Sequence, residues 1–157
     1  MSEKEVFIVA GSRTPMGGLQ GAFNDMTAVE LGTAAIAETV KRSGIDAGEI
    51  EDVIMGCVLP AGLKQGPARQ AAIGAGVPKH AGAVTINKLC GSGMQASCYA
   101  HDQIKAGSCD VMIAGGMESM TNAPHIVLKA RQGVRSGHSS MYDHMFFDGL
   151  EDAYTGR

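Results

Sequence analysis

The amino-acid sequence predicts an α/β fold in which a mostly parallel sheet carries helices on both faces. Short apolar runs rich in β-branched residues alternate with longer segments of helical periodicity, and this alternation is typical of parallel sheets. Of the 157 residues, 45% are hydrophobic and 18% are charged, so the chain can bury one substantial core and is neither a disordered segment nor a coiled coil.

The strands and helices follow each other in a regular order. Apolar runs predict strands over 5–10, 52–58, 83–86 and 111–114. A capping box at Thr27 and Glu30 opens the first helix, which closes at Gly44, and Pro67 takes the first-turn position of the second, over 67–74. The third helix covers 92–106 and ends at Gly107. From Met117 onward the pattern loosens with no clear strand, and we interpret 121–157 as an excursion from the core.

Charge and composition exclude several classes of protein. The net charge of −3 argues against a wide phosphate-binding face, so we expect no nucleic-acid partner. No apolar run approaches the roughly 18 to 20 residues that span a bilayer, so we expect no membrane partner. The N-terminus resembles neither a signal peptide nor a transit peptide. The four cysteines form no C-x-x-C pair, so we expect no metal site. We expect the thiols to be reduced and the protein to be cytoplasmic.

Cys90 is the candidate nucleophile because it lies on a turn between a predicted strand and a predicted helix. The unpaired N–H groups and the dipole at a helix start favour a thiolate. Gly91 and Gly93 follow it, and we expect them to shape the turn and let a substrate carbonyl approach the backbone. The remaining cysteines fall within or beside predicted elements, which favours core positions for them: Cys57, Cys98 and Cys109.

Two other motifs resemble this segment. The segment from Gly91 to Ala96 fits the G-x-G-x-x-A dinucleotide fingerprint. The acidic residue of that fingerprint would be Asp110, but Asp110 lies at the beginning of the next strand and the fingerprint requires it at the end. Dinucleotide binding therefore stays a minor alternative. The sequence also lacks the second cysteine and the tryptophan of the papain-like motif, which excludes that class.

A cysteine nucleophile needs a base, and none is identifiable among the five histidines. His101 follows Cys90 on the same predicted helix, roughly 16 Å along its axis, which is too far for it to pair with the thiol. His80 lies in a loop. The other three lie in the irregular C-terminal stretch, where we expect surface positions: His125, His138 and His144.

The segment from Asn87 to Met94, followed by 114–120, resembles the thiolases. Similarity extends over essentially the whole chain and includes 9–17, 67–72 and 148–153. The resemblance implies an acyltransferase that condenses two acetyl-CoA molecules to acetoacetyl-CoA and CoA, or catalyses the reverse thiolysis, through an acyl-cysteine at Cys90. It implies coenzyme A thioesters as substrates and no cofactor.

The resemblance also implies roles for further residues. The Cys90 backbone N–H would contribute to an oxyanion hole, and Leu150 matches a position that lines the pantetheine channel in thiolases. The loop from Thr121 to about Arg135 matches the one through which thiolase dimers join into tetramers. The strand over 83–86 matches the one that pairs across the dimer. We therefore expect a homo-oligomer.

Thiolases are well over twice this length and carry a Gly-His-Pro histidine and a second catalytic cysteine in their C-terminal half. This sequence has no Gly-His-Pro, so we expect 1–120 to form the N-terminal half of the core and 121–157 the truncated start of the loop region. A C-terminal thiolase half is then the expected partner, and the chain alone is expected to be inactive. The alternatives are a long-chain 3-ketoacyl-CoA thiolase and a non-catalytic, CoA-binding scaffold relative.

Overall fold

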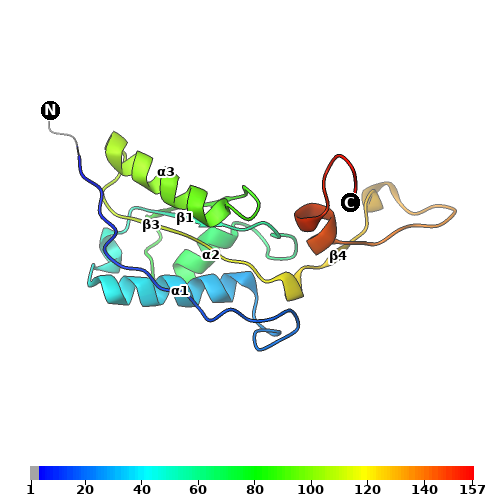
Figure 1. The fold of residues 1–157 in the computed structure, drawn as a ribbon, viewed down its shortest axis with the longest axis horizontal. Coiled ribbons are helices and arrows are strands. Elements are labelled where there is room, and N and C mark those ends of the chain that lie inside the picture. The colour runs from blue at the N-terminus through cyan, green and yellow to red at the C-terminus, as the bar shows by residue number, and fades with distance from the viewer. Residues whose placement is uncertain (1–3) are drawn as a thin grey trace.

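The computed structural model describes residues 4–157, and its centre is a three-stranded parallel sheet (Figure 1). Strand β1 (Asp52–Gly56) lies in the middle, with β2 (Gly82–Ile86) on one side and β3 (Met112–Gly116) on the other. The register pairs Gly56 with Ile86 and with Gly116, so the carboxyl ends of all three strands meet at one edge.

Helices cover both faces of this sheet, as the sequence predicts. Helices α1 (Ala28–Ser43) and α2 (Pro67–Gly74) pack together on one face, and α3 (Ser92–Ala106) lies on the other (Figure 1). Side chains alternate along a strand, so Val53 and Met55 enter the core beneath α1 and α2, whereas Gly56 faces α3. The predicted caps are also confirmed: both hydrogen bonds of the Thr27 capping box form, and α1 and α3 end at glycines with positive φ.

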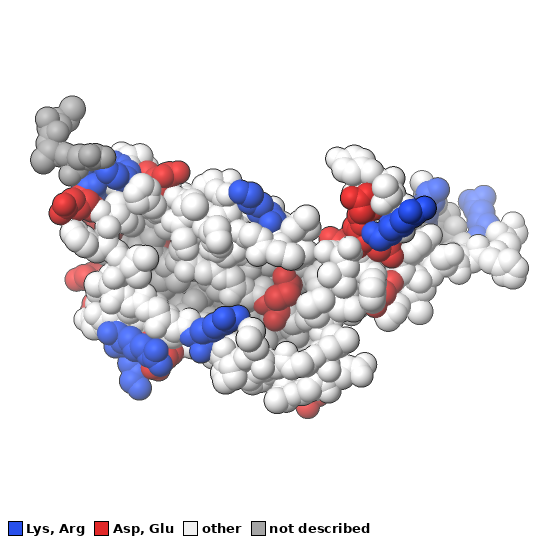
Figure 2. Space-filling view, viewed as in Figure 1, with Lys and Arg blue, Asp and Glu red and all other residues white. Residues whose placement is uncertain are grey.

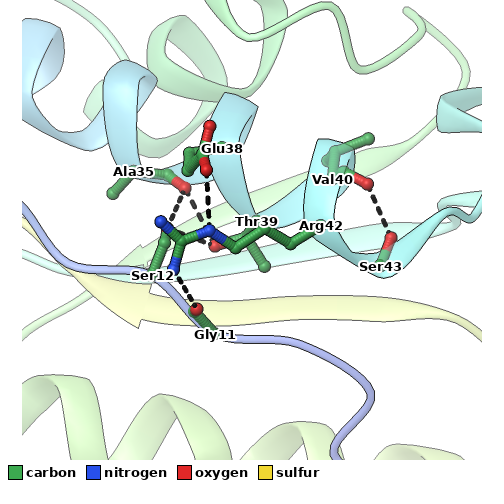
Figure 3. Close-up of polar contacts among 8 residues, drawn as sticks. All are labelled: Gly11, Ser12, Ala35, Glu38, Thr39, Val40, Arg42 and Ser43. Carbon is green, nitrogen blue, oxygen red and sulfur yellow. Dashed lines mark hydrogen bonds and ion pairs between the residues drawn. The ribbon is translucent and has the colours of Figure 1, made fainter.

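The strand predicted over 5–10 does not form. The segment is extended, but it pairs with no strand among residues 4–157, and Ile8 is 96% exposed. Instead side-chain contacts hold it at both ends, and Figure 3 shows those at Gly11 and Ser12. Ser12 Oγ donates to the Ala35 carbonyl at 2.7 Å and Arg42 Nη1 donates to the Gly11 carbonyl at 3.4 Å, while Lys4 pairs with Asp110 beside β3. A β-branched run becomes a strand only where a neighbour supplies its hydrogen bonds.

The C-terminal stretch does extend away from the core, but the expectation that it holds no strand is wrong (Figure 1). Strands β4 (His125–Ile126) and β5 (Tyr142–Asp143) pair antiparallel, and the π-helix η4 (Phe146–Leu150) follows. Strands this short carry no readable alternation. The other short elements are single turns of 3₁₀-helix: η1 (Ala47–Glu49), η2 (Met120–Asn122) and η3 (Ala130–Gln132).

Charged side chains form no broad patch of one sign on the face that Figure 2 shows. Blue and red groups are scattered over this face, and the surface between α1 and α3 is mostly uncharged and hollowed (Figure 2). Within residues 4–157, no helix is long and apolar enough to cross a membrane.

Candidate active site

Cys90 lies exposed on the turn between β2 and α3, as predicted. The preceding Leu89 has a φ of +47°, a left-handed conformation that is costly for a residue with a branched side chain. The buried Ser92 holds this turn: its hydroxyl donates to the Leu89 carbonyl at 2.6 Å and accepts the Lys88 N–H at 2.8 Å. The backbone before α3 is therefore fixed in a shape that presents the thiol to solvent.

Strand β1 approaches the start of α3 closely at Gly56, a glycine to which the sequence analysis assigned no role. A Cβ on Gly56 would lie 2.5 Å from Ser92 Cβ and 2.8 Å from Gly93 N, so only glycine lets β1 meet the start of α3. At Gly93 a Cβ would lie 3.6 Å from Gly116 N and 3.7 Å from the Gly115 carbonyl, so a methyl group would already be in contact with the end of β3. Gly91 has a φ of −88°, and a Cβ built on it would lie 3.4 Å from the Lys88 carbonyl oxygen, which is an ordinary contact.

Cys90 and Leu150 line the same cleft, which has a volume of about 440 Å³. The sequence separates these two residues widely, and the fold joins them by returning η4 to the carboxyl edge of the sheet. Arg13 and Glu118 are the charged residues of the lining, and Met145 and Gly149 complete the wall from the C-terminal stretch. A second cavity of about 710 Å³ shares Arg13, Glu118 and Leu150 with the cleft and opens between the loop over 13–23 and η2.

Glu118 organises the loop after β1, and sequence reasoning assigned it no role. Its carboxylate accepts the N–H groups of Val58 at 2.7 Å and Leu59 at 3.1 Å, and the Cys57 thiol at 3.5 Å. Two signals in the sequence pointed to Glu118: it lies two residues after the glycine-rich end of a strand, and it belongs to the segment 114–120 that resembles the thiolases. Burial and the negative charge of Glu118 raise the pKa of the Cys57 thiol to about 12, so Cys57 stays protonated at neutral pH.

The other cysteines differ from Cys90 in burial. Cys57 and Cys109 are buried, as expected, and burial together with the charges of Glu51 and Asp52 raises the pKa of Cys109. Cys98 was expected in the core, but it is exposed. Helix α3 buries the stripe Ser92, Ala96 and Ala100, spaced four residues apart, and Cys98 lies off that stripe.

No histidine lines the Cys90 cleft, counting residues 4 to 157 only. His101 lies on the surface of α3, where its Nδ1 is 3.0 Å from Asp102 Oδ1. His144, predicted to be a surface residue, is buried instead, and its Nδ1 lies 2.6 Å from Asp148 Oδ2. His144 lies next to the cleft wall, between β5 and η4, and no periodic pattern in the sequence predicts this position.

Proteins of known sequence are similar to almost the whole of this chain. The acetyl-CoA acetyltransferase 2 of Arabidopsis thaliana is 47% identical over 155 residues, which is 99% of this chain and 38% of the relative. The acetyl-CoA acetyltransferase of Pseudomonas aeruginosa is 46% identical over 152 residues, 97% of this chain and 39% of the relative. The chain therefore spans about two fifths of the length of these curated relatives.

A solved structure has the same fold. The crystal structure of Acat5 thiolase from Ascaris suum in complex with coenzyme A superposes with a TM-score of 0.94 at 36% identity, covering 98% of this chain and 40% of that one. The family described as the N-terminal domain of thiolase matches residues 6–157. With this match over nearly its whole length, the chain belongs to the thiolase family.

Proposed function

We propose that this chain supplies the nucleophile-bearing part of an acetyl-CoA acetyltransferase, with Cys90 as the residue that is acylated. The observation that carries the proposal is the cleft in which Cys90, exposed on its strained turn, meets Leu150. The names of the relatives and the coenzyme A in the Ascaris suum structure support acyl-CoA as the substrate class.

In the first half-reaction, the Cys90 thiolate attacks the carbonyl carbon of acetyl-CoA. The carbon–sulfur bond to CoA breaks, and the departing CoA thiolate takes up the proton that Cys90 released. The Cys90 N–H would contribute to stabilising the oxyanion, whereas the neighbouring N–H groups of Gly91 and Ser92 already donate to the Lys88 and Leu89 carbonyls. In the second half-reaction, a base removes a proton from the methyl group of another acetyl-CoA. The resulting carbanion attacks acetyl-Cys90, which releases acetoacetyl-CoA and restores the thiolate.

The base for the second half-reaction is proposed to come from a C-terminal thiolase half. The cleft lining within residues 4–157 offers Arg13 and Glu118 as charged groups, and the Glu118 carboxylate is occupied by the N–H groups of Val58 and Leu59. Neither is placed to act as a proton acceptor for a substrate methyl group. This arrangement supports an enzyme that is completed by further protein.

Assembly and location belong to the same proposal. Strand β2 is an edge strand of the sheet with Val84 45% exposed, which suits pairing with a second copy across a dimer. Residues 121–135 would then join dimers into tetramers. Free thiols at all four cysteines suit a reducing, cytoplasmic compartment. The condensation of acetyl-CoA proposed above would place the chain in lipid metabolism.

The test is thiolysis of acetoacetyl-CoA by this chain combined with a C-terminal thiolase half. We expect turnover with the wild-type chain, none with Cys90→Ala, and normal turnover with Cys98→Ala, which removes another exposed thiol. Radiolabel from acetyl-CoA should map to Cys90. Turnover by Cys90→Ala, or label on another cysteine, would overturn the assignment. A preference for long-chain ketoacyl-CoA over acetoacetyl-CoA would instead identify the chain as part of a long-chain 3-ketoacyl-CoA thiolase.

A further inference from the structure

His144 is a buried histidine beside the wall of the Cys90 cleft, and the reaction proposed above does not use it. Its side chain is 7% exposed, and its backbone N–H donates to the Pro124 carbonyl at 3.1 Å. It stands between β5 and η4, directly before Met145, which lines the cleft.

Both ring nitrogens of His144 have a partner, and the partners fix the tautomer. Nδ1 lies 2.6 Å from Asp148 Oδ2, and an ionised carboxylate only accepts hydrogen bonds, so Nδ1 carries the proton. The Ala61 N–H donates to Nε2 at 3.4 Å, so Nε2 carries the lone pair. Asp148 is the charged group that faces the ring from its own helix, whereas the loop over 59–61 and the segment before β4 present backbone groups.

These contacts connect η4 to the loop after β1. Glu118 holds the first part of that loop through Val58 and Leu59, and His144 holds the next part through Ala61. The two segments also pack tightly, since a Cβ on Gly149 would lie 3.2 Å from Leu59 Cδ2. Leu150, the next residue, lines the cleft with Cys90.

We infer that His144 is a positioning residue: through Nε2 it fixes η4 against the Ala61 loop, and so sets the distance between Leu150 and Cys90 across which an acyl-CoA thioester must fit. Asp148 acts one step further back, by holding the tautomer that leaves Nε2 free to accept. The inference rests on the proposed function, because it assigns the cleft to a coenzyme A thioester.

His101 provides a matched control. It forms the same kind of pair with a neighbouring aspartate, Asp102, but the pair is exposed on α3 and contacts no backbone N–H of another segment within residues 4–157. Removing the His101 ring therefore removes the same imidazole and aspartate pair as removing the His144 ring does, without loosening the cleft wall.

The first measurement is nitrogen NMR of the 157-residue chain, which reports the tautomer of each histidine directly. We expect the Nδ1–H form for His144 and slow hydrogen exchange at the Ala61 amide that is lost in His144→Ala and kept in His101→Ala. His144→Gln, whose amide oxygen can reach the Nε2 position, should keep the protection. A proton on Nε2 in the wild-type chain, or an unchanged Ala61 amide in His144→Ala, would overturn the inference.

The second measurement is thiolysis kinetics of the same variants combined with a C-terminal thiolase half. We expect His144→Ala to raise the KM for acetoacetyl-CoA about tenfold and to leave kcat within about twofold, and His144→Gln to restore KM to within about threefold. An unchanged KM in a folded His144→Ala would refute the positioning role while leaving the proposed function intact. If the wild-type assembly shows no thiolysis, the proposed function fails. In that case the Kd for coenzyme A, measured by calorimetry on the same variants, tests the role of His144. We expect a Kd about tenfold higher for His144→Ala and within about threefold of the wild-type value for His144→Gln.

Discussion

The cysteines of this chain have the same side chain and very different surroundings, which decide what each can do. Cys90 and Cys98 are exposed, whereas Cys57 and Cys109 are buried. Only Cys90 stands at the start of a helix and in a cleft, where the helix dipole favours developing negative charge. Cys57 lies against the Glu118 carboxylate, which disfavours a thiolate.

Thiol alkylation should separate these residues. At pH 8, iodoacetamide should label Cys90 first and Cys98 next. Cys57 should be labelled last, because a pKa of about 12 instead of 9.0 leaves about a thousandfold fewer thiolates. Peptide mapping by mass spectrometry over a time course gives the order. Labelling of Cys57 in the folded chain at a rate equal to that of Cys98 would contradict the assignment.

The raised pKa of Cys57 also predicts a loss of stability in alkaline solution. The folded thiol keeps its proton up to about pH 12, whereas the unfolded thiol releases it near its ordinary value of 9.0. The stabilisation is therefore complete below pH 9 and is lost as the pH rises from 9 towards 12, by up to about 1.4 kcal/mol per pH unit. Urea unfolding at pH 8, 9 and 10 measures it. Cys57→Ala should show a shallower slope than the wild-type chain, and equal slopes would disprove the linkage.

At the scale of elements, the contact between the end of β1 and the start of α3 places the nucleophile. Gly56 lies against Ser92 and Gly93, and Gly93 in turn lies against Gly116 at the end of β3. Glycines allow the strands to approach the helix backbone directly, and Ser92 then reaches the turn that carries Cys90. The geometry of the site is thus set by backbone packing between elements.

Substitutions at these glycines should differ in cost. Gly56→Ala should lower the free energy of unfolding by at least about 2 kcal/mol, because its Cβ meets backbone atoms that cannot move aside. Gly93→Val should lose stability and activity together, because a Cβ there would already be in contact with Gly116 N at 3.6 Å and valine adds two further methyl groups to it. Gly91→Ala is the control, with a change within about 1 kcal/mol. Thermal unfolding and thiolysis measure both effects. A Gly56→Ala variant as stable as Gly91→Ala would refute this packing.

At the scale of the whole molecule, the chain leaves apolar surface uncovered. Phe7 is 74% exposed and Ile8 96%, on a segment that is extended but unpaired within residues 4–157. Strands β2 and β3 both have a free edge in this part of the chain. Exposed apolar runs and open sheet edges favour association with other chains.

The chain alone should therefore self-associate and show no thiolysis. Light scattering after size-exclusion chromatography should detect oligomers, and Ile8→Lys should reduce their proportion. Tyr154→Lys is the control, because it removes an equally exposed apolar side chain, 96% exposed, from the C-terminal stretch. A monomeric chain with robust thiolysis would contradict both expectations and would require a base within this chain.

The sequence by itself determined the helices, the three parallel strands of the sheet and the turn that carries Cys90. These features depend on local chemistry: the Thr27 capping box, Pro67 in a first turn and glycines at helix ends act within a few residues. The resemblance added Leu150 as a residue of the substrate channel, and the structure places it in the cleft with Cys90.

Only the tertiary structure decided the features that depend on distant partners. The apolar run over 5–10 reads as a strand, but strand formation needs a neighbour's hydrogen bonds, and none is present within residues 4–157. Glu118 and His144 gain their roles from backbone N–H groups of the loop after β1, which lie far away in the sequence. Long-range contacts leave no periodic pattern in a single sequence, so the cleft around Cys90 became visible only once the chain was folded.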